Sequence, residues 1–76
     1  MTANNRAGSQ LTTLAVLNTY IERNGYAPGL DELAELRNMT TGGIRYHMLY
    51  LMRQGYILKT GKHWRDVLIT EKGASA

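Results

Sequence analysis

Apolar residues recur at intervals of three or four over residues 11–24, which is the spacing of one face of an α-helix. The members of this series are Leu11, Leu14, Leu17 and Ile21. Gly25 follows directly, and glycine commonly ends helices because it adopts left-handed backbone angles without strain. The pattern therefore predicts a first helix over residues 11–24.

A second and shorter helix is predicted over residues 30–37. Pro28 lacks an amide hydrogen and keeps the residue before it extended, so the segment that precedes this helix is a turn. Gly29 can serve as the N-cap, and the carboxylates of Asp31 and Glu32 are favourable in the positively charged first turn. The apolar side of the helix consists of Leu30, Leu33, Ala34 and Leu36.

A third helix is predicted to begin after Thr40, a good N-cap residue, and to end at Gly55. A rotation of about 100° per residue separates its side chains into two opposite sides. The core side is expected to hold Ile44, His47, Met48, Leu51 and Gly55. The exposed side is expected to hold Gly42, Arg45, Tyr46, Leu49 and Arg53. His47 is therefore expected to be a histidine at the edge of the core.

The segments 56–60 and 65–70 are rich in β-branched or aromatic residues and flank the polar stretch 61–64, which predicts a β-hairpin. Ile57, Val67 and Ile69 should point inward, with Lys59 and Leu68 more exposed. Three helices followed by two strands give a mostly α fold with a small β-hairpin. The predicted architecture is a winged helix-turn-helix, in which a three-helix bundle carries the hairpin as its wing.

The length of 76 residues allows one small domain, and 43% hydrophobic with 20% charged residues is typical of a soluble globular fold. We expect residues 11–70 to form the domain, between flexible tails at 1–10 and 71–76. The absence of cysteine excludes disulfides, thiolate zinc sites and a cysteine nucleophile. Neither a secretory signal nor an apolar run of membrane-spanning length is found, so we expect no membrane partner and a cytoplasmic location.

Charge is distributed unevenly along the chain. Residues 1–36 contain two basic and four acidic residues, a net charge of −2, whereas residues 37–76 contain seven basic and two acidic residues, a net charge of +5. Such an asymmetry indicates one positive face, for which a phosphate backbone is the commonest partner, although it is also compatible with a merely solvated face.

The exposed side of the third helix offers candidate contacts to DNA. Arg45 can donate two hydrogen bonds to a guanine, and Tyr46 and Leu49 can pack on a thymine methyl or a sugar, or else against another protein chain. Thr40 and Thr41 can donate to a phosphate or simply cap the helix. Without side chains, Gly42 and Gly43 would let the helix N-terminus approach a phosphate or base closely, unless both belong to the turn.

The predicted wing adds Lys59, Lys62, His63 and Arg65, which could contact phosphates. Trp64 either folds back on the hairpin or touches a partner. The complete set of predicted DNA-binding residues is Thr40, Thr41, Gly42, Gly43, Arg45, Tyr46, Leu49, Arg53, Lys59, Lys62, His63, Trp64 and Arg65.

Enzyme chemistry is not expected. Neither His47 nor His63 has a partner at metal-ligand spacing, and no Ser-His-Asp set or phosphate-binding glycine loop can be assembled. We therefore predict no catalytic residue, no metal, no cofactor and no small-molecule substrate.

Three segments share motifs with a known family. Residues 24–34 contain a Gly-x-x-Pro sequence that leads into the second helix, residues 47–57 contain a histidine-led apolar run that leads to a glycine and an apolar strand, and residues 65–70 match a second wing strand. Over about residues 11–70 the chain resembles the N-terminal DNA-binding domain of the LexA repressor family. It departs from that family at Leu36–Met39, where the turn is one residue shorter and lacks the usual glycine.

The resemblance implies that the start of the third helix and the residues just before it read the major groove, while the wing tip touches the backbone. The matching positions are Thr40, Thr41, Gly42, Gly43, Arg45, Tyr46, Lys62, His63 and Arg65. Full-length members of the family also have a self-cleaving Ser-Lys peptidase domain that dimerises them. The present sequence lacks that domain, so we expect either an isolated fragment or, by preference, a freestanding small regulator of phage or prokaryotic type.

These observations predict a sequence-specific double-stranded DNA-binding protein, a transcriptional regulator and repressor-like protein that can form a homodimer on DNA. The alternative is a winged-helix protein-interaction module that uses the apolar residues of the third helix together with Trp64. In a variant of that alternative, Leu49, Tyr50 and Met52 form a homodimer seam.

Overall fold

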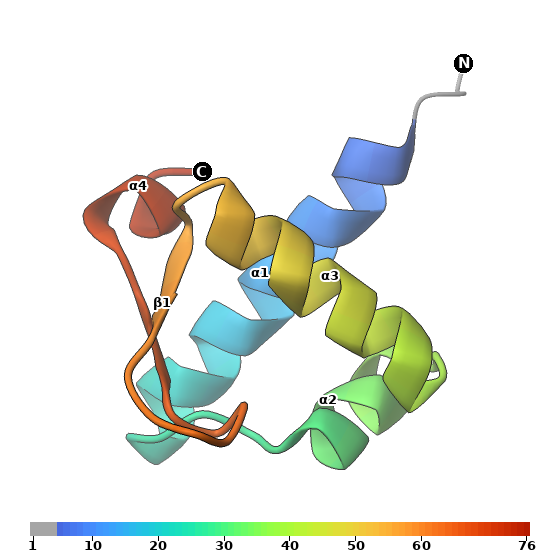
Figure 1. Cartoon of the computed structure of the whole chain (residues 1–76), viewed down its shortest axis with the longest axis horizontal. Coiled ribbons are helices and arrows are strands. Elements are labelled where there is room, and N and C mark those ends of the chain that lie inside the picture. Colours follow the sequence, from blue (N-terminus) through green and yellow to red (C-terminus); the bar gives the residue numbers. More distant parts are fainter. Residues whose placement is uncertain (1–4) are drawn as a thin grey trace.

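The computed structural model describes residues 5–76 as four helices and one antiparallel hairpin (Figure 1). In chain order the elements are α1 (Asn5–Asn24), α2 (Leu30–Arg37), α3 (Thr41–Arg53), β1 (Ile57–Lys59), β2 (Val67–Ile69) and α4 (Glu71–Ala74). The predicted order of three helices and a hairpin is confirmed. The fold is the winged helix-turn-helix, with one short helix added after the wing.

Helix α1 is longer than the sequence pattern predicted. It begins at Asn5 instead of Leu11, so most of the expected N-terminal tail is helical, and the rest of that tail, residues 1–4, lies outside the described residues. The polar, turn-forming composition was misleading because tertiary contacts hold this segment: Gln10 is buried, and the Arg37 guanidinium donates a hydrogen bond to the Ser9 carbonyl at 3.1 Å. The Thr12 hydroxyl also donates to the Gly8 carbonyl at 2.9 Å.

The tight turn between α2 and α3 contains no glycine, and Asn38 takes the left-handed position that often falls to glycine at a helix end. Asn38 has a left-handed conformation with φ of 56°, which asparagine tolerates better than most residues, and its amide donates back to the end of α2. Helix α3 then begins at Thr41, with the Thr40 side chain accepting a hydrogen bond from the Gly43 amide at 3.0 Å. Gly42 and Gly43 therefore belong to the first helical turn.

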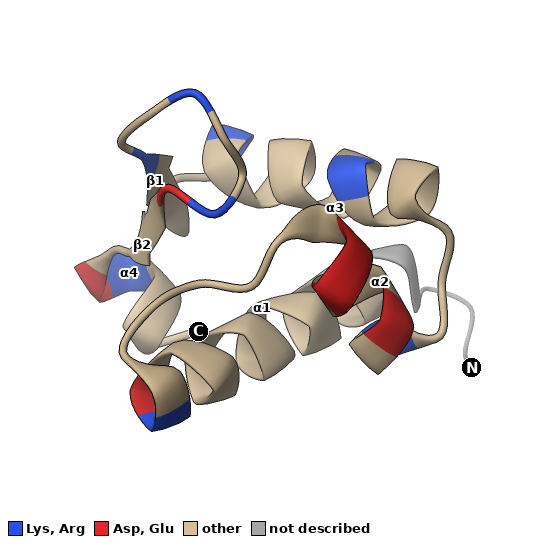
Figure 2. Ribbon diagram, turned by 90° about the horizontal axis from the view of Figure 1, so that it is seen from below, with Lys and Arg blue, Asp and Glu red and all other residues tan. Residues whose placement is uncertain are grey.

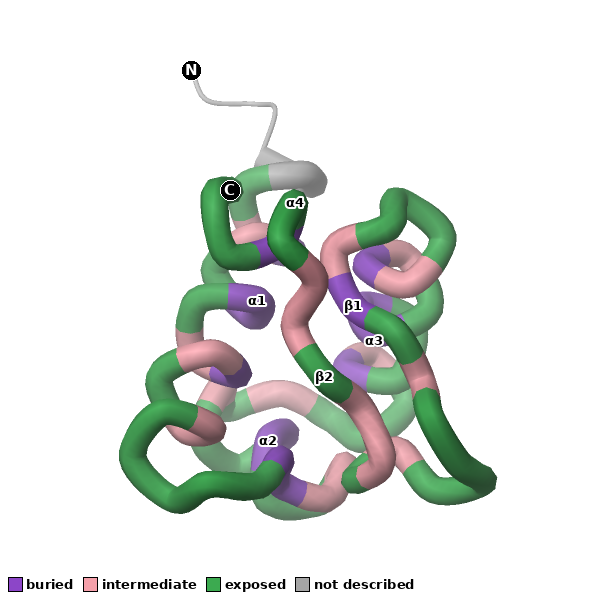
Figure 3. The backbone as a smooth tube through the Cα atoms, turned by 90° about the vertical axis from the view of Figure 1, so that its left-hand side faces the viewer, coloured by how far each residue is buried: buried purple, intermediate pink, exposed green. Residues whose placement is uncertain are grey.

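The core lies where α1, α2, α3 and β1 meet, and Figure 3 shows their buried segments facing one another. Helix α3 supplies Ile44, His47, Met48 and Leu51 to it, as predicted. Two expectations were wrong. Gly55 follows the end of α3 with φ of 83° and is exposed, and Leu36 is 56% exposed because the short α2 turns it away from the core.

The wing pairs Ile57 with Ile69, Leu58 with Leu68 and Lys59 with Val67. Ile57 is buried and Leu68 is exposed, as expected. Lys59 is half-buried, because its ammonium folds over the hairpin onto the Trp64 ring and the Lys62 carbonyl.

The segment after the wing was predicted to be a tail, but residues 71–74 form helix α4. Thr70 caps this helix and Gly73 packs directly on the Tyr56 carbonyl, where no larger residue fits. None of the helices among residues 5–76 has the length and hydrophobicity required to cross a membrane.

Candidate nucleic-acid interface

The predicted DNA-binding residues of α3 lie on its outer side, away from the core. Tyr46 is 62% exposed and Leu49 is 38% exposed, although both are large and partly apolar. Arg45 and Arg53 are also exposed and form no ion pair with any other described residue. Thr41 and Gly42 are exposed at the helix N-terminus, next to the half-buried Gly43. The predicted reading side of the helix is thus open to solvent.

The wing and α3 border the same groove. This groove has a volume of about 930 Å³ and runs between the N-terminus of α2, the Arg45 position of α3 and the hairpin tip. Lysine and arginine segments of α3 and of the hairpin loop lie on the same side of the ribbon (Figure 2). Of the predicted DNA-binding residues, those that line the groove are Arg45, Lys59, Lys62, His63, Trp64 and Arg65.

The groove is not uniformly positive, because Asp31, Glu32 and Asp66 also line it. The other candidates lie elsewhere. Thr41 borders a separate groove of about 410 Å³ beside α2, and Arg53 is in the last turn of α3, at the opposite end from the N-cap Thr40. The structure therefore brings Arg45 to the wing residues but distributes the remaining candidates along α3.

The wing tip is a closed loop organised by Asp66. The Asp66 carboxylate accepts a hydrogen bond from the His63 amide at 3.2 Å. The backbone carbonyl of Asp66 accepts one from the Thr60 amide at 2.7 Å. Gly61 lies so close to the Asp66 side chain that a Cβ there would be 2.5 Å from the carboxylate oxygen. This internal order leaves Lys62 and His63 exposed at the tip.

Trp64 folds back on the hairpin, which was one of the two alternatives for this residue. Its ring packs against the hydrophobic core, and the Lys59 ammonium lies 4.5 Å from the ring centroid. The same ammonium donates a hydrogen bond to the Lys62 carbonyl at 2.9 Å. Lys59 and Trp64 therefore stabilise the shape of the wing, and Lys62 is the lysine whose side chain extends freely among the described residues.

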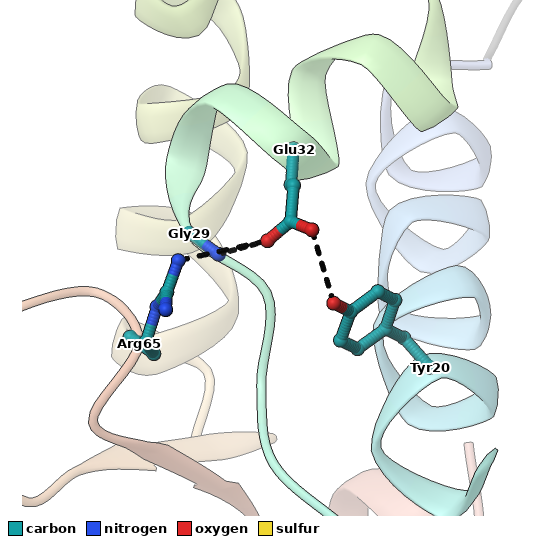
Figure 4. Close-up of polar contacts among 4 residues, drawn as sticks. All are labelled: Tyr20, Gly29, Glu32 and Arg65. Carbon is teal, nitrogen blue, oxygen red and sulfur yellow. Dashed lines mark hydrogen bonds and ion pairs between the residues drawn. The ribbon is translucent and has the colours of Figure 1, made fainter. Parts of the chain in front are cut away.

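Arg65 is engaged with α2. Its Nη2 lies 3.6 Å from Oε1 of Glu32, while the Tyr20 hydroxyl of α1 donates to Oε2 of the same carboxylate at 3.1 Å (Figure 4). Partial desolvation and, after it, the bond to Glu32 raise the pKa of the Tyr20 hydroxyl. Sequence reasoning missed Glu32 and Tyr20. The available signal was Glu32 itself, which stands three residues after the N-cap, where a carboxylate can accept a hydrogen bond from the N-cap amide, here that of Gly29 at 3.4 Å.

Arg37 does not contribute to the positive face, although it was counted in the basic half of the chain. Its Nε donates to the Thr13 hydroxyl at 2.9 Å, and that hydroxyl also lies 2.8 Å from Nδ1 of the buried His47. Burial and, secondly, the nearby Arg37 charge lower the pKa of His47. This polar cluster joins α1, α2 and α3 on the side of α3 that faces the core, so its role is structural.

Comparison with known proteins gives a consistent result. The family described as LexA DNA binding domain matches residues 5–65. A LexA repressor of Thermosipho africanus is 30% identical over 63 residues, which are 83% of this chain and 32% of that protein. A LexA repressor of Thermosipho melanesiensis is 29% identical over 66 residues, covering 87% and 33%, and one of Thermotoga neapolitana is 37% identical over 62 residues, covering 82% and 32%. The chain thus spans about a third of the length of these relatives.

Proposed function

This chain belongs to the LexA DNA-binding domain family, and on that basis we propose that it binds double-stranded DNA sequence-specifically and regulates transcription. The observation that carries the proposal is the combination of an open outer side on α3 with a wing whose Lys62 and His63 project beside it. The matched region is a DNA-binding domain, which has no enzymatic activity of its own.

Helix α3 enters the major groove in this proposal. A groove about 12 Å wide admits an α-helix. Arg45 donates two hydrogen bonds to N7 and O6 of a guanine, and Tyr46 packs on a neighbouring thymine methyl. Gly42 has open space where a side chain would begin, so the first turn of α3 can approach the DNA backbone closely with its amides directed at a phosphate.

The wing contacts the neighbouring backbone. Lys62 and His63 are the exposed tip residues, and they bind phosphates without reading sequence. Lys59 and Arg65 were predicted to do the same. In the free protein their charged groups are held by Trp64 and Glu32, so we assign the main backbone contacts of the wing to Lys62 and His63.

A single domain of this size makes few base contacts, so useful specificity requires two copies. We propose that two copies occupy half-sites about one helical turn apart, and that they act in the cytoplasm without a cofactor.

Selection of bound sequences from a random duplex pool tests the proposal. Enrichment of a palindromic site that contains a guanine in each half is the expected result, and an unenriched pool would refute sequence-specific binding. On the enriched site, neutralisation of four to six phosphates predicts a log-log salt slope of about −4 to −5. A salt-independent affinity would contradict backbone contact by the wing.

A second candidate function is protein binding, which the exposure of Tyr46 and Leu49 favours. Trp64, which was expected to join such a surface, packs on the core instead. An electrophoretic shift with random duplex DNA at low salt separates the candidates, because only the DNA-binding function produces it.

A further inference from the structure

The carboxylate of Glu32 connects three parts of the molecule (Figure 4). Its Oε1 accepts a hydrogen bond from the Gly29 amide at 3.4 Å and lies 3.6 Å from Nη2 of Arg65, and its Oε2 accepts from the Tyr20 hydroxyl at 3.1 Å. Among the side chains that the structure describes, those of residues 8–76, this is the one ion pair, and it joins the wing to the N-terminus of α2. The wing is thereby tied to the helix-turn-helix at a point outside the core.

The site is shaped to receive the arginine. A Cβ on Gly29 would lie 3.1 Å from Nη2 of Arg65, so a side chain at this position would crowd the guanidinium. Arg65 is also adjacent to Asp66, which organises the closed loop that carries Lys62 and His63. A shift of Arg65 relative to α2 would consequently move the whole tip relative to α3.

We propose that Glu32 is a positioning residue for DNA recognition, which holds Arg65 and so fixes the orientation of the wing relative to α3. With this orientation set, Arg45 and Lys62 reach the bases and the backbone of the same duplex. The inference rests on the proposed function. An exposed ion pair contributes little to global stability, so its effect is expected in the geometry of binding and not in the free energy of unfolding.

A positioning role and simple electrostatics predict opposite changes in affinity for the selected site when Glu32 is neutralised. Glu32 is a negative charge beside the proposed phosphate contacts, so its neutralisation should by Coulombic attraction alone tighten binding to every DNA. If Glu32 orients the wing, neutralisation should tighten binding to random DNA but weaken binding to the selected site.

The variant Glu32→Gln makes this test, because glutamine retains a side-chain oxygen that can accept the hydrogen bond from the Gly29 amide while losing the charge. We expect the ratio of affinities for selected and random duplexes to fall about two- to fivefold, the range an exposed ion pair supports. Asp31→Asn is the matched control. It removes the same charge from the same groove, has no hydrogen bond or ion pair to the wing among the described residues, and should tighten both affinities with the ratio unchanged.

The variant Arg65→Gln and the double variant complete a thermodynamic cycle. If Glu32 and Arg65 act through their mutual contact, Arg65→Gln lowers the ratio of affinities for selected and random duplexes as much as Glu32→Gln does. The double variant then lowers this ratio no further. Unfolding midpoints of all variants should stay close to that of the parent protein.

Three results would overturn the proposal: an unchanged or higher ratio for Glu32→Gln, additive effects in the double variant, or a salt slope about one unit shallower for Arg65→Gln, which would make Arg65 a phosphate contact. A parent protein that does not distinguish selected from random DNA would refute the proposed function itself, and the positioning role with it. Failure of the positioning role alone leaves the parent ratio intact.

Discussion

On its inner side helix α3 places Ile44, Met48 and Leu51 at 0–1% exposure, whereas on its outer side Tyr46 remains 62% exposed. Both sides belong to one helix of 13 residues, Thr41–Arg53. The inner side is explained by the free energy of burial, because each of its apolar side chains is removed from water. The outer side has no such explanation: an exposed tyrosine and leucine, beside arginines that form no ion pair with a described residue, add little to stability. The difference teaches that folding accounts for the inner side and leaves the outer side to the proposed contact with DNA.

The largest effect is expected on the inner side. Leu51 is fully buried, so Leu51→Ala removes apolar contacts and leaves a cavity, which should lower the free energy of unfolding by about 2–5 kcal/mol. Urea denaturation followed by circular dichroism measures this loss. Under conditions where the variant stays folded, its preference among DNA sequences should match that of the parent. A changed preference would break the division between the two sides.

On the outer side, a substitution should change DNA binding and leave the free energy of unfolding almost unchanged. Arg45→Ala should reduce affinity for the selected site by about 1–3 kcal/mol and relax the preference at the base pair it contacts. Its free energy of unfolding should change by less than about 0.5 kcal/mol, because the side chain is exposed and forms no ion pair with any described residue. Fluorescence anisotropy on the selected duplex and on single-base variants makes the measurement.

Lys62→Ala is the matched control for Arg45→Ala. This variant should weaken binding to all sequences alike and reduce the salt slope by about one unit. If Lys62→Ala changed the base preference and Arg45→Ala did not, the roles assigned to α3 and to the wing would have to be exchanged.

At Gly42 the requirements of helix stability and of DNA binding are opposed. A methyl group at this position would meet no atom within 4 Å, so Gly42→Ala should stabilise the protein by up to about 1 kcal/mol through higher helix propensity. The same methyl would stand between the helix N-terminus and DNA, so affinity for the selected site should fall. Thermal unfolding measures the expected gain in stability, and fluorescence anisotropy measures the expected loss of affinity. A variant that gains stability without losing affinity would place Gly42 outside the interface.

The smallest predicted effect concerns pH and the inner side. The pKa of the buried His47 is lowered below its ordinary value near 6.5, so the unfolded chain binds a proton more readily than the folded one. Stability should therefore decline as pH falls from about 6.5 towards the lowered pKa of the folded state. His47→Asn should make the stability between pH 7 and 5 less dependent on pH. An equal slope in both proteins would assign the dependence to other groups.

The same two sides explain what the sequence could predict. The helical period of α3 placed Ile44 and Leu51 inside and Arg45 outside, because one helix must bury one stripe of its surface. The N-terminal part of α1 was missed because its order depends on Arg37, which is 28 residues away from Ser9. Counting charges likewise could not show that Arg37 points into a polar cluster or that Arg65 pairs with Glu32. Such contacts between residues far apart in the sequence produce no periodic pattern along the chain from which they could be predicted.

The most direct test of the central claim maps backbone amide resonances while the selected duplex is added to the labelled protein. The amides of residues 41–46 in α3 and of residues 61–65 in the wing should shift together, at the same DNA concentration, while those of residues 14–21 in α1 stay in place. Shifts confined to α1, or shifts in α3 without any in the wing, would contradict a single interface formed by the outer side of α3 and the hairpin tip.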